Sequence, residues 1–158
     1  ASYTPSNGTT DVESSTSFAI EYTGVEGLTL GYAVGEENAE GGTNNNDNDT
    51  YYIKYAYGPG TVGIQQSERD NTAATNDDEF DAIGITYQVS DDLSIGYHAS
   101  SRDLGDKAFD EESKSLSVAY TQGGMTVKAQ SVSMDNVGGS SSARDDIDGY
   151  KVSVSFAF

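Results

Sequence analysis

The sequence predicts an all-β chain that folds as an antiparallel up-and-down transmembrane β-barrel, with about nine strands visible. Three observations support this fold class. Apolar and polar residues alternate over long runs, short and long connections follow one another in strict order, and the apolar positions of the runs carry no charge. The sequence holds no run of about 18 apolar residues, the length that a transmembrane helix needs.

Composition alone gives the opposite impression. Leu, Ile, Val and Phe together make up 28 of the 158 residues, and 8 basic against 26 acidic residues leave a net charge of −18. A combined share of Leu, Ile, Val and Phe below about 20%, together with a high net charge, is typical of disordered chains. The absence of cysteine excludes disulfides, thiolate metal sites and a cysteine nucleophile. The negative charge argues against nucleic acid as a partner, because phosphate binding needs clustered Lys and Arg.

The first four predicted strands lie at residues 15–23, 28–36, 50–58 and 61–69. Their alternating apolar residues are Phe18, Ile20 and Tyr22; Leu28, Leu30, Tyr32 and Val34; Tyr51, Ile53, Tyr55 and Tyr57; and Val62 and Ile64. Successive side chains of a strand point to opposite faces, so each run has one apolar and one polar face. Residues 1–4 are interpreted as the end of a tenth, truncated strand.

Five further strands are predicted at residues 80–90, 93–103, 114–122, 125–134 and 148–158. Their apolar residues are Ile83, Ile85, Tyr87 and Val89; Leu93, Ile95, Tyr97 and Ala99; Leu116, Val118 and Tyr120; Met125, Val127 and Ala129; and Tyr150, Val152, Val154, Phe156 and Phe158. The runs are about nine to eleven residues long, which suits a tilted strand crossing a bilayer. The opposite face is too polar to form a second core layer, which argues against a soluble β-domain.

The connections between the runs differ in length at the two ends. The short ones, at 24–27, 59–60, 90–92 and 123–124, contain Gly or Asp, which suit tight turns. The long ones, at about 37–49, 70–79, 103–113 and 135–147, with another before residue 15, are rich in Asn, Asp, Glu, Ser and Gly. This order is typical of outer-membrane barrels, which have short turns at one end and long loops at the other.

Aromatic residues recur on the apolar face close to the short connections. A ring of aromatics at one depth marks a membrane interface. The predicted aromatic girdle consists of Tyr22, Tyr57, Tyr87, Tyr120, Phe156 and Phe158.

Most basic residues within strands share the parity of the polar face, whereas most acidic residues lie in connections or near strand ends. In a wide barrel, the polar face lines a channel. The residues predicted to face the lumen are Lys54, Arg69, His98, Arg102, Lys128, Lys151, Glu21, Gln65 and Gln130.

The closing run, Asp148-Gly-Tyr-Lys-Val-Ser-Val-Ser-Phe-Ala-Phe158, resembles the last strand of Gram-negative general diffusion porins of the alphaproteobacterial type. The whole chain resembles the C-terminal half of such a porin. The resemblance implies a barrel of about sixteen strands, of which residues 1–158 form the C-terminal portion as a single unit. It also implies that Phe158 is the signal read by the barrel-assembly machinery. A small ten-stranded barrel is the alternative.

The resemblance further implies a multi-pass protein of the bacterial outer membrane, in contact with lipid and lipopolysaccharide and assembled as a homotrimer. Its expected function is a water-filled channel for passive diffusion of ions and small hydrophilic solutes. The alternative is a small closed barrel that serves as an anchor or adhesin through acidic extracellular loops. No enzymatic activity is expected, because His98 has no GxSxG, HExxH or cysteine partner motif.

Acidic tracts in the long connections offer hard oxygen ligands of the kind that Ca²⁺ prefers. A weak calcium site is a possibility at Asp47, Asp49, Asp77 and Asp78, and no other cofactor is expected. The alternative interpretation is that these residues simply keep the loops soluble and apart, since none matches the EF-hand spacing.

Overall fold

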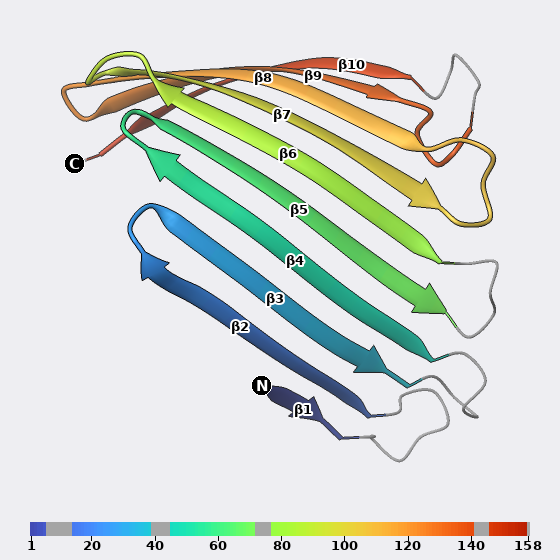
Figure 1. Ribbon diagram of the computed structural model, residues 1–158. Coiled ribbons are helices and arrows are strands. Elements are labelled where there is room, and N and C mark those ends of the chain that lie inside the picture. The colour runs from blue at the N-terminus through green and yellow to red at the C-terminus, as the bar shows by residue number, and fades with distance from the viewer. Residues whose placement is uncertain (6–13, 39–44, 72–76, 141–145, 158) are drawn as a thin grey trace.

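The computed structural model describes residues 1–5, 14–38, 45–71, 77–140 and 146–157. Ten strands form one antiparallel, curved sheet in which each strand pairs with the next along the chain (Figure 1). The strands are β1 (Ser2–Thr4), β2 (Ser15–Val25), β3 (Leu28–Glu37), β4 (Asn46–Tyr57), β5 (Gly60–Asn71), β6 (Asp78–Gln88), β7 (Leu93–Leu104), β8 (Glu111–Gln122), β9 (Met125–Asp135) and β10 (Ile147–Phe156). The all-β, up-and-down prediction is confirmed.

The short tenth strand also forms. Residues Ser2–Thr4 pair with residues 15–17 of β2, so this segment extends the sheet by one edge strand. The other nine strands match the nine predicted runs in order, with ends that differ by up to four residues, because period-two alternation is the direct signature of a strand with two different faces.

The strands are longer at the long-connection end than the sequence predicted. β4 begins at Asn46 and β8 at Glu111, within segments that were assigned to loops. Asp47, Asp49 and Asp78 therefore lie in strands, and placing them in loops was wrong. Backbone pairing continues there, with Asp49 opposite Glu68, because ladder hydrogen bonds do not depend on apolar side chains.

The short connections are tight turns, as expected. Gly123 and Gly124 join β8 to β9 with φ values of 58° and 82°. Positive φ is costly for residues with a Cβ, so glycine suits this two-residue turn. The β2–β3 hairpin instead carries a register shift between Tyr22 and Val25.

The sheet is a single layer without a core. No hydrophobic side chain of the described residues is buried, and large apolar residues such as Ile20, Ile64 and Leu116 are 58%, 49% and 57% exposed. A soluble β-domain would cover this face with a second layer. The described residues supply no such layer, so the apolar face must meet lipid or another protein surface.

The two edges of the sheet are β1 and β10, and they do not pair with each other. The described strands therefore form an open sheet, whereas the alternative of a small ten-stranded barrel requires these edges to join. Among the described residues, no helix is long and apolar enough to span a membrane.

Candidate functional site

The polar face of the sheet is the candidate functional surface. In an antiparallel ladder, directly paired residues point to the same side. The register aligns Lys54, Gly63, Gly84 and His98 in one row across β4 to β7. Following the same parity along each strand places all nine residues that were predicted to face the lumen on this one face: Lys54, Arg69, His98, Arg102, Lys128, Lys151, Glu21, Gln65 and Gln130.

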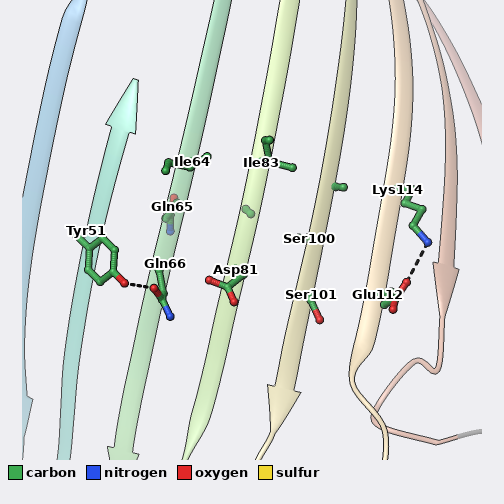
Figure 2. A pocket seen from close by; sticks show the side chains of 12 residues that line it. Tyr51, Ile64, Gln65, Gln66, Asp81, Ile83, Ser100, Ser101, Glu112 and Lys114 are labelled. Carbon is green, nitrogen blue, oxygen red and sulfur yellow. Dashed lines mark hydrogen bonds and ion pairs between the residues drawn. The ribbon is translucent and has the colours of Figure 1, made fainter. Parts of the chain in front are cut away.

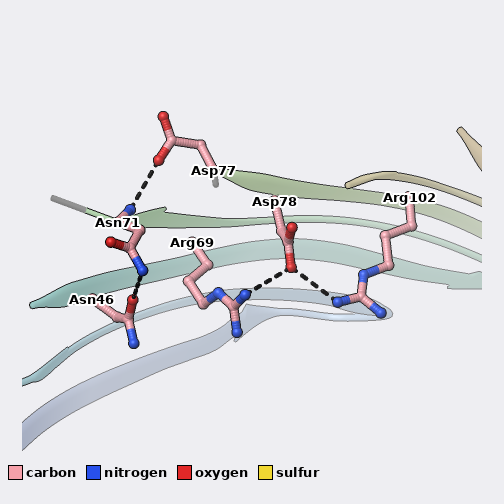
Figure 3. Close-up of polar contacts among 6 residues, drawn as sticks. All are labelled: Asn46, Arg69, Asn71, Asp77, Asp78 and Arg102. Carbon is pink, nitrogen blue, oxygen red and sulfur yellow. Dashed lines mark hydrogen bonds and ion pairs between the residues drawn. The ribbon is translucent and has the colours of Figure 1, made fainter. Parts of the chain in front are cut away.

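The two arginines of the predicted set share one carboxylate near the long-connection end. The guanidinium of Arg69 lies 3.0 Å from Oδ2 of Asp78, and that of Arg102 lies 2.9 Å from the same oxygen (Figure 3). Asp78 comes from β6, between the two strands that carry the arginines. Its side chain is 17% exposed, against 46% and 45% for Arg69 and Arg102. The cluster keeps one net positive charge, and each guanidinium retains free N–H groups facing water.

Neighbouring polar contacts hold the same end of the sheet together. The backbone N–H of Asn71 donates to Oδ1 of Asp77 at 2.8 Å, and the Asn71 amide donates to Oδ1 of Asn46 at 2.9 Å (Figure 3). The first bond joins the end of β5 to the residue before β6, and the second joins the ends of β5 and β4, beside the Arg69–Asp78–Arg102 cluster. Sequence reasoning could not find them, because they depend on which strand ends meet.

A tyrosine crosses the polar face above a glycine. The ring of Tyr52 on β4 lies over Gly31 of β3, and its hydroxyl donates to Oε2 of Glu21 on β2. A Cβ at Gly31 would overlap this ring. The glycine therefore permits a hydrogen bond between residues two strands apart, and Glu21, the one acidic residue among those predicted to face the lumen, has a defined partner.

The remaining predicted lysines lie in the half of the sheet near the short turns. Lys128 is opposite Ser153, and Lys151 is opposite Gln130. Both lysines are exposed, and neither takes part in the ion pairs found within the described residues. They are thus two uncompensated positive charges on the polar face, in contrast to the Arg69–Asp78–Arg102 cluster.

The apolar face carries the predicted aromatic residues close to the short turns. Tyr57 and Phe156 are the last residues of β4 and β10, and Tyr22, Tyr87 and Tyr120 lie within three residues of the ends of β2, β6 and β8. They are 38% to 78% exposed. Tyr57 also stacks on Tyr55, with ring centroids 6.4 Å apart. Phe158, the predicted assembly signal and last girdle residue, lies outside the described residues.

At the opposite end, the apolar face becomes polar, which the sequence analysis missed. Asp49, Glu68, Glu79 and Asp103 are paired in one row on this face. Next to this row, on its short-turn side, lies a shallow hollow of about 420 Å³, bordered by Tyr51, Gln66, Asp81 and Ser101. Figure 2 shows the Tyr51 hydroxyl directed at Gln66 and the Lys114 ammonium directed at Glu112, at 2.9 Å. The sequence contained a signal for this polar end, because Asp49 lies two residues before Tyr51 and therefore on the same face of the strand.

The residues suggested for calcium are not gathered into a site. Asp78 is bound by two arginines, and Asp77 accepts a backbone N–H. Asp47 and Asp49 are two residues apart in β4 and lie on the same face as its apolar residues. Within the described ranges, no group of three or more His, Cys, Asp or Glu residues is placed to hold a metal ion. Calcium binding stays a prediction.

A comparison with known protein families agrees with a sheet that has one polar and one apolar face. A family model described as "Gram-negative porin" matches residues 1–126 of the 158. This range runs from β1 to the start of β9 and includes the polar-face residues from Glu21 to Arg102. A search of curated proteins found no match to the chain.

Proposed function

This chain belongs to the Gram-negative porin family, and from that premise we propose that it forms a water-filled channel for passive diffusion of ions and small hydrophilic solutes. Family membership implies the outer membrane as its location and a channel rather than an enzyme. In this proposal, the apolar face meets lipid and the polar face lines the aqueous lumen.

The observation that carries the proposal is the contrast between the two faces of one single-layered sheet. On one face, residues such as Ile53, Ile64 and Ile85 form exposed apolar rows. On the other, Lys54, His98 and Lys151 stand among Gly, Ala, Ser and Thr. Small side chains leave room in a lumen, whereas a narrow barrel fills its interior with larger ones. This favours a wide conducting pore over an anchor or adhesin.

The open edges bear on how the channel is completed. Unpaired backbone N–H and C=O groups in hydrocarbon cost several kcal/mol each. We therefore expect β1 and β10 to pair with additional strands, as in the larger barrel to which the sequence resemblance points. A homotrimer in contact with lipopolysaccharide remains part of this proposal, as does recognition of Phe158 by the barrel-assembly machinery.

Planar bilayer recording tests the proposal. The full-length protein, refolded in detergent, is added to a planar bilayer in potassium chloride, and current is recorded at fixed voltage. Stepwise, ohmic conductance increments are the expected result. Folding is checked independently by the heat-dependent mobility shift of barrels on gels. Folded protein that inserts into vesicles and leaves the bilayer silent would overturn the channel and favour the anchor.

A further inference from the structure

A hollow of about 330 Å³ lies on the polar face between β4 and β7. Lys54 borders it at one end and His98 at the other, with Tyr52 and Gln65 at its side. Its floor is made by Gly63, Ala82 and Gly84. The register aligns Lys54, Gly63, Gly84 and His98 in one row, so the hollow runs straight across the strands.

The floor of the hollow is open because it contains two glycines, Gly63 and Gly84. The surrounding structure has room for a side chain at both positions. A Cβ at Gly84 would have no atom within 4 Å, and a Cβ at Gly63 would lie 3.7 Å from the Ile53 carbonyl oxygen. Neither residue has positive φ. Larger side chains would therefore fit the fold and fill the hollow. The contrast is Gly31, where the Tyr52 ring leaves no such room.

The side chains of Tyr52 and Gln65, which border the hollow, are held away from its floor. Tyr52 leans over Gly31 toward β2, where its hydroxyl is bound to Glu21. Gln65 donates from Nε2 to Oγ of Ser67 at 3.1 Å, along its own strand. Both side chains thus have hydrogen-bond partners outside the hollow, so the space over Gly63 and Gly84 is formed before any solute enters.

The charges around the hollow favour an anion. Lys54 and His98 are exposed and take part in none of the ion pairs found within the described residues. Glu21 lies on β2, two strands away from Lys54, and accepts a hydrogen bond from Tyr52. Three strand spacings, about 14 Å, separate the Lys54 and His98 backbones, and both residues line the hollow between them. An ammonium and an imidazole N–H can donate to two carboxylate groups of one small solute.

We propose that this hollow is a binding subsite for small dicarboxylates on their way through the pore, with Lys54 and His98 as its two donors. The inference rests on the proposed channel function and specifies a solute class for it. The subsite lies on the wall and leaves the rest of the lumen free, so binding slows passage without closing the channel.

The test is single-channel recording of the full-length protein at low salt with succinate as probe and succinamide as its uncharged counterpart. Succinate is expected to lower the mean current and add noise in a saturable manner, and succinamide is expected to do neither. Lys54→Gln and His98→Gln should each raise the apparent dissociation constant for succinate roughly three- to ten-fold, the size of losing one exposed charge-assisted hydrogen bond.

A matched glycine pair separates the hollow from general narrowing of the pore. Gly84→Leu fills the hollow, whereas Gly149→Leu adds the same side chain on the same face, in β10, where a Cβ also has no atom within 4 Å. Gly84→Leu should abolish succinate binding and Gly149→Leu should preserve it. Equal succinate affinity in both variants, or an equal response to succinamide, would overturn the subsite. A protein that conducts normally but ignores succinate would overturn it while leaving the channel function intact.

Discussion

The ring of Tyr52 lies over the backbone of Gly31, so that a Cβ on Gly31 would overlap the ring. Gly31 is buried beneath it, whereas the neighbouring residues on this face are half-buried or exposed. The arrangement lets the Tyr52 hydroxyl reach Glu21 across the intervening strand. It ties β2, β3 and β4 together on the side that lines the proposed channel.

Gly31→Val should therefore destabilise the protein by about 2 kcal/mol, because the ring must move and its hydrogen bond to Glu21 is lost. Tyr52→Phe should cost about 1 kcal/mol, because only the hydrogen bond is removed. Urea unfolding in detergent micelles measures both effects. Gly149→Val is the control, since a Cβ there has open space around it. An equal loss in all three variants would contradict this role of Gly31.

Asp78 should set the charge at one end of the proposed lumen. Asp78→Asn frees Arg69 and Arg102 from their shared carboxylate, so anion preference should rise and the protein should lose about 1 kcal/mol of stability. Reversal potentials in a salt gradient measure the first effect. Asp106→Asn removes a carboxylate paired with Lys107 outside the strands and serves as the control. The assignment fails if both variants shift the reversal potential equally.

Lys128 and Lys151 should contribute to ion preference through their position on the polar face. Lys128→Glu or Lys151→Glu is expected to raise cation preference, because each changes the lumen charge by two units. Lys114→Glu makes the same change on the opposite face, where Lys114 pairs with Ser133, and should leave the reversal potential unchanged. If Lys114→Glu has the largest effect, the faces have been assigned the wrong way round.

The membrane environment of the apolar face can be tested with two adjacent residues of β6. Ile85 pairs with Val62 and Tyr97 on the apolar face, whereas Thr86 pairs with Thr61 and Gly96 on the polar face. Ile85→Arg should reduce the free energy of folding into lipid vesicles by roughly 2–4 kcal/mol. Thr86→Arg should have little effect, because its side chain meets water. A similar cost for both would argue against lipid on one face alone.

The parity of each strand could be predicted because it is local. Phe18, Ile20 and Tyr22 reveal their shared face without any knowledge of the neighbouring strand. All nine residues predicted for the lumen share one face for this reason. Strand length was less predictable. Residues 46–49 have the composition of a loop, and it is their partners on β3 and β5 that keep them in the sheet.

Contacts between strands lay beyond the sequence pattern. The meeting of Arg69 and Arg102 at Asp78 depends on the register of β5, β6 and β7, which side-chain alternation alone leaves open by steps of two residues. The register of β3 and β4, which pairs Gly31 with Tyr52, likewise brings the Tyr52 ring over Gly31.

The sequence by itself determined the all-β class, the order of short and long connections, and the face on which each strand residue lies, because these follow from near neighbours in the chain. Tertiary structure alone decided which side chains meet, where the polar face is hollow, and that β1 and β10 do not pair with each other. Those features arise from hydrogen-bond pairing between strands, and pairing depends on the relative position of segments rather than on the alternation within any one of them.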